Sequence, residues 1–117
     1  MMKRNIIAEK TFDFALKIID LYVKLIKENE YVLSKQLLKS GTSIGANVEE
    51  SIAAQSTKDF INKLSISAKE ARETRYWLRL LDKSKLTQIN VNEHLSDVEE
   101  IIKILTKIIK TSQEKNL

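Results

Sequence analysis

Residues 12–26 read FDFALKIIDLYVKLI, a segment in which nearly every side chain is apolar. Its few polar residues recur at steps of four, three and four, which is the repeat of an α-helix with one narrow stripe facing water. These residues are Asp13, Lys17, Asp20 and Lys24. Each acid stands four residues before a base, and such pairs stabilise a helix by about 0.2–0.5 kcal/mol each. The segment therefore predicts an amphipathic helix that ends near Asn29.

Three further segments repeat this helical spacing. The second spans residues 31–52 and keeps its register through two glycines. The third begins with a capping-box pattern and spans residues 56–82. The fourth begins at a cap supplied by Asn90 or Asn92, and we expect residues 111–117 to fray.

The lengths of these segments indicate the fold. Helices of about 20–25 residues that are joined by short connections pack most naturally as an antiparallel up-and-down four-helix bundle. A chain of 117 residues fits one domain with a single modest core. We therefore expect an all-α fold in which residues 1–117 form one four-helix bundle domain.

The composition narrows the class of protein. Proline and cysteine are both absent, so long helices are allowed throughout, whereas disulfides, thiolate nucleophiles and sulfur-ligated metals are excluded. The basic start MMKRNIIAEK lacks a continuous apolar region, and no segment approaches the roughly 18 apolar residues of a membrane span. These features favour a cytoplasmic protein that makes no membrane contact.

Both glycines of the chain lie in residues 40–51, SGTSIGANVEES. The segment lacks the lysine and hydroxyl of a GxxxxGK[ST] phosphate loop, and it lacks the third glycine of a GxGxxG dinucleotide loop. Glycine costs a helix about 0.5–1 kcal/mol relative to alanine, so two glycines one turn apart need a compensating role. We expect Gly41 and Gly45 to allow tight helix packing, the alternatives being a ligand site on exposed backbone or a break in the helix.

Catalytic and metal-binding patterns do not emerge from the sequence. A di-iron bundle needs two Glu-x-x-His pairs, whereas this chain has one histidine, His94, with a valine three residues before it. The adjacent Glu49 and Glu50 diverge by about 100° on a helix and cannot act on one substrate atom. Glu70 and Glu73 share a face but neighbour basic residues, which favours ion pairing. We therefore expect no enzyme activity, no metal and no cofactor.

The third helix carries three of the chain's four arginines, at steps of three and four beside its core stripe. A lysine and a tyrosine lie on the neighbouring surface, as on an RNA-binding face, and the chain start is also basic. The alternative is a row of salt bridges to neighbouring helices. A net charge of +4 and a pI near 9.3 indicate a modest preference for polyanions. The candidate nucleic-acid-binding residues are Lys3, Arg4, Lys69, Arg72, Arg75, Tyr76 and Arg79.

The apolar surface exceeds what one bundle needs. A helix in a monomeric bundle requires one apolar stripe, yet the first helix has only one polar stripe, and the third and fourth carry apolar residues beside their core positions. Large contiguous apolar patches on a protein surface usually mark interfaces. We therefore expect a homo-oligomer whose interface candidates are Ile66, Trp77, Leu80, Ile101, Ile104 and Ile108.

Two stretches resemble a known family: residues 36–51, QLLKSGTSIGANVEES, and residues 59–81, DFINKLSISAKEARETRYWLRLL. They are similar to the four-helix bundle proteins also called 23S ribosomal RNA intervening-sequence proteins, and the similarity extends from about Thr11 through the fourth helix. The resemblance implies an up-and-down bundle that assembles as a homopentamer. It also implies an association with RNA, because the genes lie within ribosomal RNA intervening sequences. Accessory proteins of diversity-generating retroelements look similar in fold, and there the implied role is binding nucleic acid and a reverse transcriptase.

Two functions follow as hypotheses. The first is an oligomeric scaffold that binds RNA or another nucleic acid through phosphate contacts on its basic helix faces. The alternative is a protein–protein interaction scaffold that makes no nucleic-acid contact. The resemblance implies no catalytic residues, which agrees with the search for catalytic patterns in the sequence.

Overall fold

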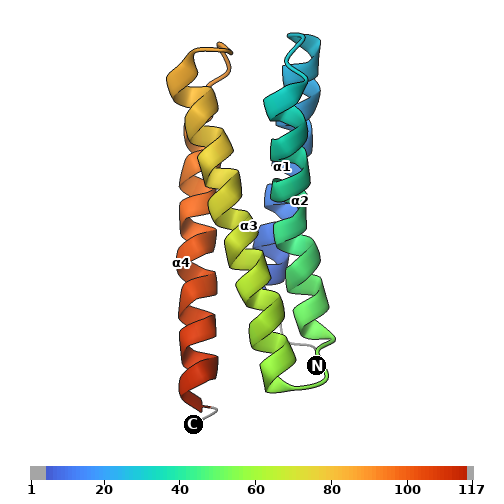
Figure 1. Cartoon of the computed structure of the whole chain (residues 1–117), viewed down its shortest axis with the longest axis vertical. Coiled ribbons are helices and arrows are strands. Elements are labelled where there is room, and N and C mark those ends of the chain that lie inside the picture. Colours follow the sequence, from blue (N-terminus) through green and yellow to red (C-terminus); the bar gives the residue numbers. More distant parts are fainter. Residues whose placement is uncertain (1–4, 116–117) are drawn as a thin grey trace.

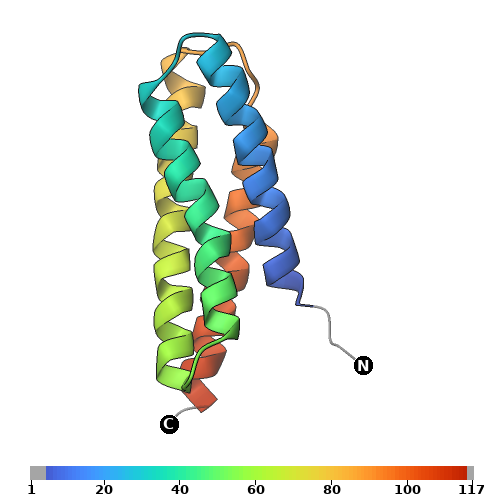
Figure 2. The ribbon, with the colours of Figure 1, turned by 90° about the vertical axis from the view of Figure 1, so that its right-hand side faces the viewer.

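The computed structural model describes residues 5–115 and consists of helices, without a strand in that range. The helices are α1 (Ile6–Lys27), α2 (Val32–Ile52), α3 (Thr57–Ser84) and α4 (Asn92–Lys115). Each helix packs beside its sequence neighbour and α1 also packs beside α4, which gives an elongated molecule of 48 × 27 × 20 Å (Figure 1). Figure 2 shows the α1–α2 and α3–α4 connections at one end of the molecule and the α2–α3 connection at the other. The prediction of an all-α fold with four helices is confirmed.

The boundaries of α1 and α3 follow from local hydrogen bonds. Asn5 caps α1, where its side-chain oxygen accepts a hydrogen bond from the backbone N–H of Ala8 at 3.0 Å. Ser56 caps α3 in the same way, through the N–H of Asp59 at 3.0 Å. Beyond the end of α1, Asn29 has a φ of 65°, and this left-handed conformation cannot continue a right-handed helix.

At the start of α2, the capping hydrogen bonds are accepted by the residue before the N-cap position. Tyr31 occupies the capping position but its side chain makes no capping hydrogen bond. The carboxylate of Glu30 instead accepts hydrogen bonds from the backbone N–H groups of Leu33 at 2.9 Å and Ser34 at 2.6 Å. A negative charge at this end also interacts favourably with the helix dipole.

The two ends of α4 differ in how well the sequence predicted them. The side chain of Asn90 accepts a hydrogen bond from the N–H of Asn92 at 2.9 Å, so Asn90 serves the first turn. Residues 111–115 are helical, and the expectation that they fray is wrong for this range. Lys115 in the last turn interacts favourably with the carboxyl end of the helix dipole.

The core is formed by apolar side chains that repeat along the inner side of each helix. Burying one such side chain stabilises the fold by about 1.5–3 kcal/mol relative to leaving it in water. In α1, the buried apolar residues follow one another at steps of four, three and four, and each is at most 2% exposed. They are Phe14, Ile18, Leu21 and Leu25. Fully buried partners come from the other helices: Leu37, Ile44, Val48, Leu64, Leu78, Leu81, Ile101 and Leu105.

Gly41 and Gly45 lie where α2 approaches α1. A Cβ atom at Gly41 would lie 2.9 Å from two carbons of the Ile18 side chain, and one at Gly45 would lie 3.3 Å from the backbone oxygen of Thr11. The helix α2 is continuous through both positions. The absence of side chains at these two residues therefore serves close packing of α1 on α2.

Buried hydroxyl groups join α2 to α3. The Ser67 hydroxyl donates a hydrogen bond to the carbonyl oxygen of Ile44 at 2.8 Å, and the hydroxyl oxygens of Ser40 and Thr74 lie 2.9 Å apart. These contacts satisfy polar groups that would otherwise be costly to bury. They help to fix the orientation of α3 relative to α2. The three arginines of α3, Arg72, Arg75 and Arg79, are called the arginine row.

Candidate nucleic-acid-binding face

The outer side of α3 carries several of the residues predicted to bind nucleic acid. On a helix that turns by 100° per residue, they fall within an arc of about 80°. Their side chains are all exposed to solvent: Lys69, Arg72, Tyr76 and Arg79. The remaining basic candidates from the chain start, Lys3 and Arg4, lie outside the described residues.

Arg75 differs from the other two arginines of α3. Its guanidinium lies 3.4 Å from the carboxylate of Glu99 on α4, and its side chain is 33% exposed. Arg72 and Arg79 form no ion pair or hydrogen bond with any residue between 5 and 115. The row is thus divided into one interhelical ion pair and two guanidinium groups whose donors face water.

Most acidic residues of α3 are turned away from these guanidinium groups. On a helical projection they lie about 100° or more from Arg72: Asp59, Glu70 and Glu73. Burial raises the pKa of Glu70, and the charge of Glu73 raises it further, against the opposing effect of Lys69 and Lys39. On the outer strip of α3, Arg72 and Arg79 therefore lie away from these carboxylates, whereas Lys69 is turned by only about 40° from Glu73.

The remaining acid of α3 lies closer to the strip. Asp82 is turned by about 80° from Arg72 on the same projection. It sits near the end of α3, where its carboxylate lies 3.9 Å from the ammonium group of Lys83. Its charge is therefore partly compensated.

The acidic residues of α4 lie mainly on the side that meets α1. The ammonium group of Lys17 lies 2.8 Å from the carboxylates of both Glu93 and Asp97. Lys10 lies 3.1 Å from Glu100. These pairs neutralise carboxylates at the α1–α4 seam, whereas Glu99 and Glu114 lie on the same side of α4 as some of its lysines.

Two of those lysines extend the positive strip of α3. Lys103 and Lys110 are exposed, and a helical projection places both within about 40° of Glu99, the residue that contacts α3. The chain turns back between α3 and α4 (Figure 1), so residues that follow Glu99 lie level with residues that precede Arg75. The following residues together are called the basic face: Lys69, Arg72, Arg79, Lys103 and Lys110.

Sequence reasoning missed the two lysines of the basic face. Lys103 and Lys110 are seven residues apart, which is the same spacing as that of Arg72 and Arg79. Seven residues make nearly two helical turns, so each pair lies along one side of its helix. This shared spacing of seven residues is the sequence pattern that indicates a basic strip on each of the two helices.

The sequence and the bundle match a known family. The model of the 23S rRNA-intervening sequence protein family matches residues 3–107. The chain belongs to this family. The matched range includes every residue of the basic face except Lys110. Among curated proteins, the search finds no match.

A solved structure provides a second comparison for this family member. The chain is similar to a protein of unknown function from the S23 ribosomal protein family of Bacteroides thetaiotaomicron VPI-5482. The two share 49% sequence identity and superpose with a TM-score of 0.86, over 93% of this chain and 99% of the other. The fold is therefore shared along nearly the whole length of both proteins.

This family member also exposes apolar side chains along α1. They recur at steps of four, three and four, about 130° around the helix from the core residue Ile18. The exposed fractions are 61% for Phe12, 52% for Leu16, 43% for Ile19 and 39% for Val23. We call these four residues the α1 apolar stripe. The wide apolar arc of residues 12–26 in the sequence is the signal for it.

The interface candidates from α3 and α4 are less available than this stripe. Trp77, Ile104 and Ile108 pack against the core of their own bundle. Leu80 is half-buried, and Ile66 is 36% exposed. Among these candidates, only Ile66 approaches the exposure of the α1 apolar stripe, whose least exposed member, Val23, is 39% exposed.

Ile101 requires a correction. It is 0% exposed, so the prediction that it faces a second copy is wrong. The reason is that α4 packs against α1 and α3 at the same time, which turns both Ile101 and Ile102 inward. A helix that contacts two neighbours buries a wider arc than a single stripe.

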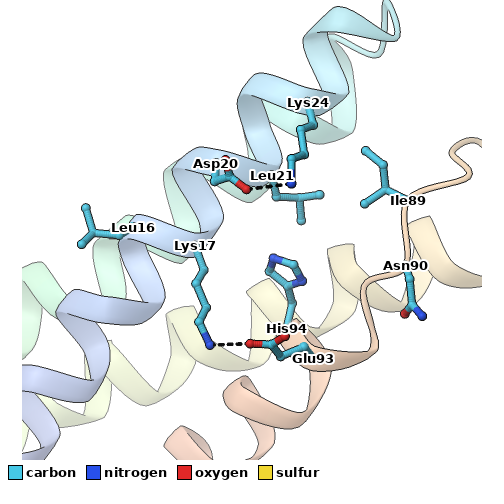
Figure 3. Close-up of a pocket in the computed structure, with 9 residues that line it drawn as sticks. All are labelled: Leu16, Lys17, Asp20, Leu21, Lys24, Ile89, Asn90, Glu93 and His94. Atoms are coloured by element: carbon cyan, nitrogen blue, oxygen red, sulfur yellow. Dashed lines mark hydrogen bonds and ion pairs between the residues drawn. The ribbon is translucent and has the colours of Figure 1, made fainter.

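A groove of about 500 Å³ lies between α1 and the start of α4 (Figure 3). Its charged groups pair with one another, since Lys17 bonds to Glu93 and Lys24 lies 3.0 Å from Asp20. His94 lines the groove, and its Nδ1 atom is buried without a hydrogen-bond partner within residues 5–115. Burial lowers the pKa of this imidazole.

Two further properties concern the described residues as a whole. No group of three or more metal-binding side chains occurs within residues 5–115. No helix in the same range is long and apolar enough to cross a lipid bilayer.

Proposed function

We propose that this protein is a non-enzymatic RNA-binding scaffold of the cytoplasm. In this proposal, the chain forms an antiparallel up-and-down bundle, copies of the bundle self-associate, and structured RNA binds across the basic face. The observation that carries it is the division of the arginine row, in which Arg75 is paired within the bundle while Arg72 and Arg79 are not.

Unpaired arginines on an exposed surface suit phosphate recognition. A guanidinium group presents donors in a planar fork that matches the oxygens of a phosphate. Arg72 and Arg79 lie on one side of α3, and Lys103 lies on the neighbouring turn of α4, so several phosphates can be contacted at once. Each contact releases counterions from the nucleic acid, which favours binding most at low salt. Family membership supports RNA as the polyanion, through the family's description as 23S rRNA-intervening sequence proteins.

Self-association is the second part of the proposal. The α1 apolar stripe places four large apolar side chains in water along one helix. Covering them stabilises an assembly by about 25 cal/mol per Å² of apolar surface. A ring-like homopentamer, as the family resemblance implies, would repeat the basic face around the assembly and raise its positive field.

Charge reversal tests the RNA-binding part. We expect the R72E/R79E double variant to lose retention of a structured RNA in a filter-binding titration, while the matched K27E/K35E variant retains it. Lys27 and Lys35 are exposed residues of α1 and α2, so the control changes the net charge equally outside the basic face. Equal loss in both variants would show that only the total charge matters and would contradict a defined face.

The alternative function is a protein–protein interaction scaffold without nucleic-acid contact. The α1 apolar stripe favours it, because an amphipathic helix of another protein could cover the same side chains. Under this alternative, R72E/R79E leaves partner capture unchanged and L16E abolishes it. Salt-dependent RNA binding by the unmodified protein would argue against it.

A further inference from the structure

Tyr76 occupies the middle of the basic face. It lies four residues after Arg72 and three residues before Arg79, so all three side chains rise from the same side of α3. The Tyr76 side chain is 53% exposed, and its hydroxyl has no hydrogen-bond partner within the described part of the chain. A large aromatic ring between two unpaired guanidinium groups therefore faces water.

The ring of Tyr76 is held in position by its neighbour. Its centroid lies 5.3 Å from that of Trp77, with the two planes at 67°, which is an edge-to-face contact. Such pairs contribute beyond the area that they bury. Trp77 is itself packed against the core, and its indole N–H lies 3.4 Å from a carboxylate oxygen of Glu73. The contact with Trp77 therefore favours one orientation of the Tyr76 ring.

We propose that Tyr76 stacks on an unpaired base of the bound RNA while Arg72 and Arg79 contact phosphates on either side of that base. This inference rests on the proposed RNA binding and adds the class of RNA. In a paired A-form helix, neighbouring bases cover both faces of each base, so an aromatic side chain can stack only on bases in loops, bulges or single strands. Stacking on aromatic rings is tolerant of sequence, because every base has a π face.

The unpaired bases can be removed from the RNA without changing the protein. Two hairpins with identical stems and identical loop lengths are compared, one with normal loop nucleotides and one with abasic loop nucleotides. Both carry the same phosphates, so purely electrostatic binding treats them alike. We expect the normal hairpin to bind about 5- to 150-fold more tightly, which is the range for stacking of one base on an aromatic side chain.

Trp77 provides a direct signal for this contact. It is the only tryptophan of the chain, and its ring touches that of Tyr76. We expect the normal hairpin to change the tryptophan emission at saturation, whereas the abasic hairpin leaves it nearly unchanged. No label has to be added to the protein.

Variants of Tyr76 test the same stacking contact by changing the protein instead of the RNA. Y76L is expected to lose about 5- to 150-fold in affinity for the normal hairpin and to bind the abasic hairpin as the unmodified protein does. Y76F should retain binding within about threefold, because the aromatic face is kept. Y31L is the matched control, since Tyr31 is 60% exposed at the start of α2 and lies outside the basic face.

The outcomes separate this inference from the proposed function. Equal affinity of the unmodified protein for the two hairpins overturns the stacking role. If R72E/R79E then loses affinity for both hairpins, the proposed RNA binding through the arginines still stands. Failure of the unmodified protein to bind either hairpin at low salt overturns both. A preference for the normal hairpin that persists in Y76L also overturns the role of this residue.

Discussion

The guanidinium of Arg75 lies 3.4 Å from the carboxylate of Glu99, and this ion pair joins α3 to α4 beside the basic face. It neutralises the acidic residue of α4 that lies nearest to the arginine row. Both side chains are partly exposed, so the pair contributes little to stability, about 0–1 kcal/mol. Its larger effect is on the electrostatic potential of the face.

The first prediction concerns this pair. R75A should lower the affinity for RNA several-fold, because Glu99 then presents an uncompensated negative charge to the phosphates. Adding E99Q should restore most of the affinity, and the midpoint of urea unfolding should change little in either variant. Fluorescence anisotropy with labelled RNA measures the affinities. If R75A/E99Q binds as weakly as R75A, Arg75 contacts the RNA itself.

The second prediction concerns the packing of α1 on α2. G41A should lower the free energy of unfolding by about 0–2 kcal/mol in total. The new Cβ would lie 2.9 Å from side-chain carbons of the buried Ile18, and such overpacking costs about 1–3 kcal/mol. The gain in helix propensity, about 1 kcal/mol, offsets part of this cost. Urea denaturation followed by circular dichroism measures it. A G41A protein more stable than the original would contradict the close packing of the two helices.

The third prediction concerns pH. Burial lowers the pKa of His94 below its usual value of about 6.5. The charges of Glu93 and Asp97 and a hydrogen bond with the backbone of Lys17 raise this pKa, whereas the charge of Lys17 lowers it. As the pH falls through 6.5, the unfolded chain takes up the proton before the folded chain does, so the free energy of unfolding decreases. The melting temperature should therefore fall between pH 7.5 and 5.5, and it should fall less in H94Q. Because His94 is the only histidine of the chain, identical pH profiles would refute this assignment.

The fourth prediction concerns self-association. L16E places a charge in the centre of the α1 apolar stripe and should reduce the mass measured by light scattering towards that of one chain, 13.5 kDa. Circular dichroism should remain helical, since Leu16 is 52% exposed and lies outside the core. The control is L86E, at a residue that is 59% exposed in the α3–α4 connection. An unchanged mass in L16E would exclude the stripe as the contact between copies.

The sequence predicted the helices because their polar residues keep a strict spacing. In residues 12–26, the polar steps of four, three and four define a helix and its water-facing stripe without reference to any other segment. They do not decide which of the two flanking apolar stripes is buried, and the structure buries the one that contains Phe14, Ile18 and Leu21. The cap of α3 at Ser56 is equally local, since it requires only a backbone N–H three residues away. Features that depend on a few neighbouring residues were therefore accessible from sequence alone.

Features that depend on contacts between helices were not accessible. Arg72 and Arg75 look alike in sequence, and only the position of Glu99, 24 residues after Arg75, distinguishes the paired arginine from the unpaired one. Apolar residues occupy so wide an arc of α4 that several rotations of the helix would bury a stripe. The observed rotation, which buries Ile101, satisfies the contacts with α1 and α3 together, including the pair between Lys10 and Glu100.

The salt dependence of RNA binding tests the central claim most directly, namely that unpaired arginines of the basic face contact phosphates. The logarithm of the binding constant should fall linearly with the logarithm of the salt concentration, and R72A/R79A should reduce the size of this slope by about 1.4–1.8, because each lost phosphate contact accounts for about 0.7–0.9. Binding that is absent at low salt, or a slope that is the same in the double variant, would contradict the account.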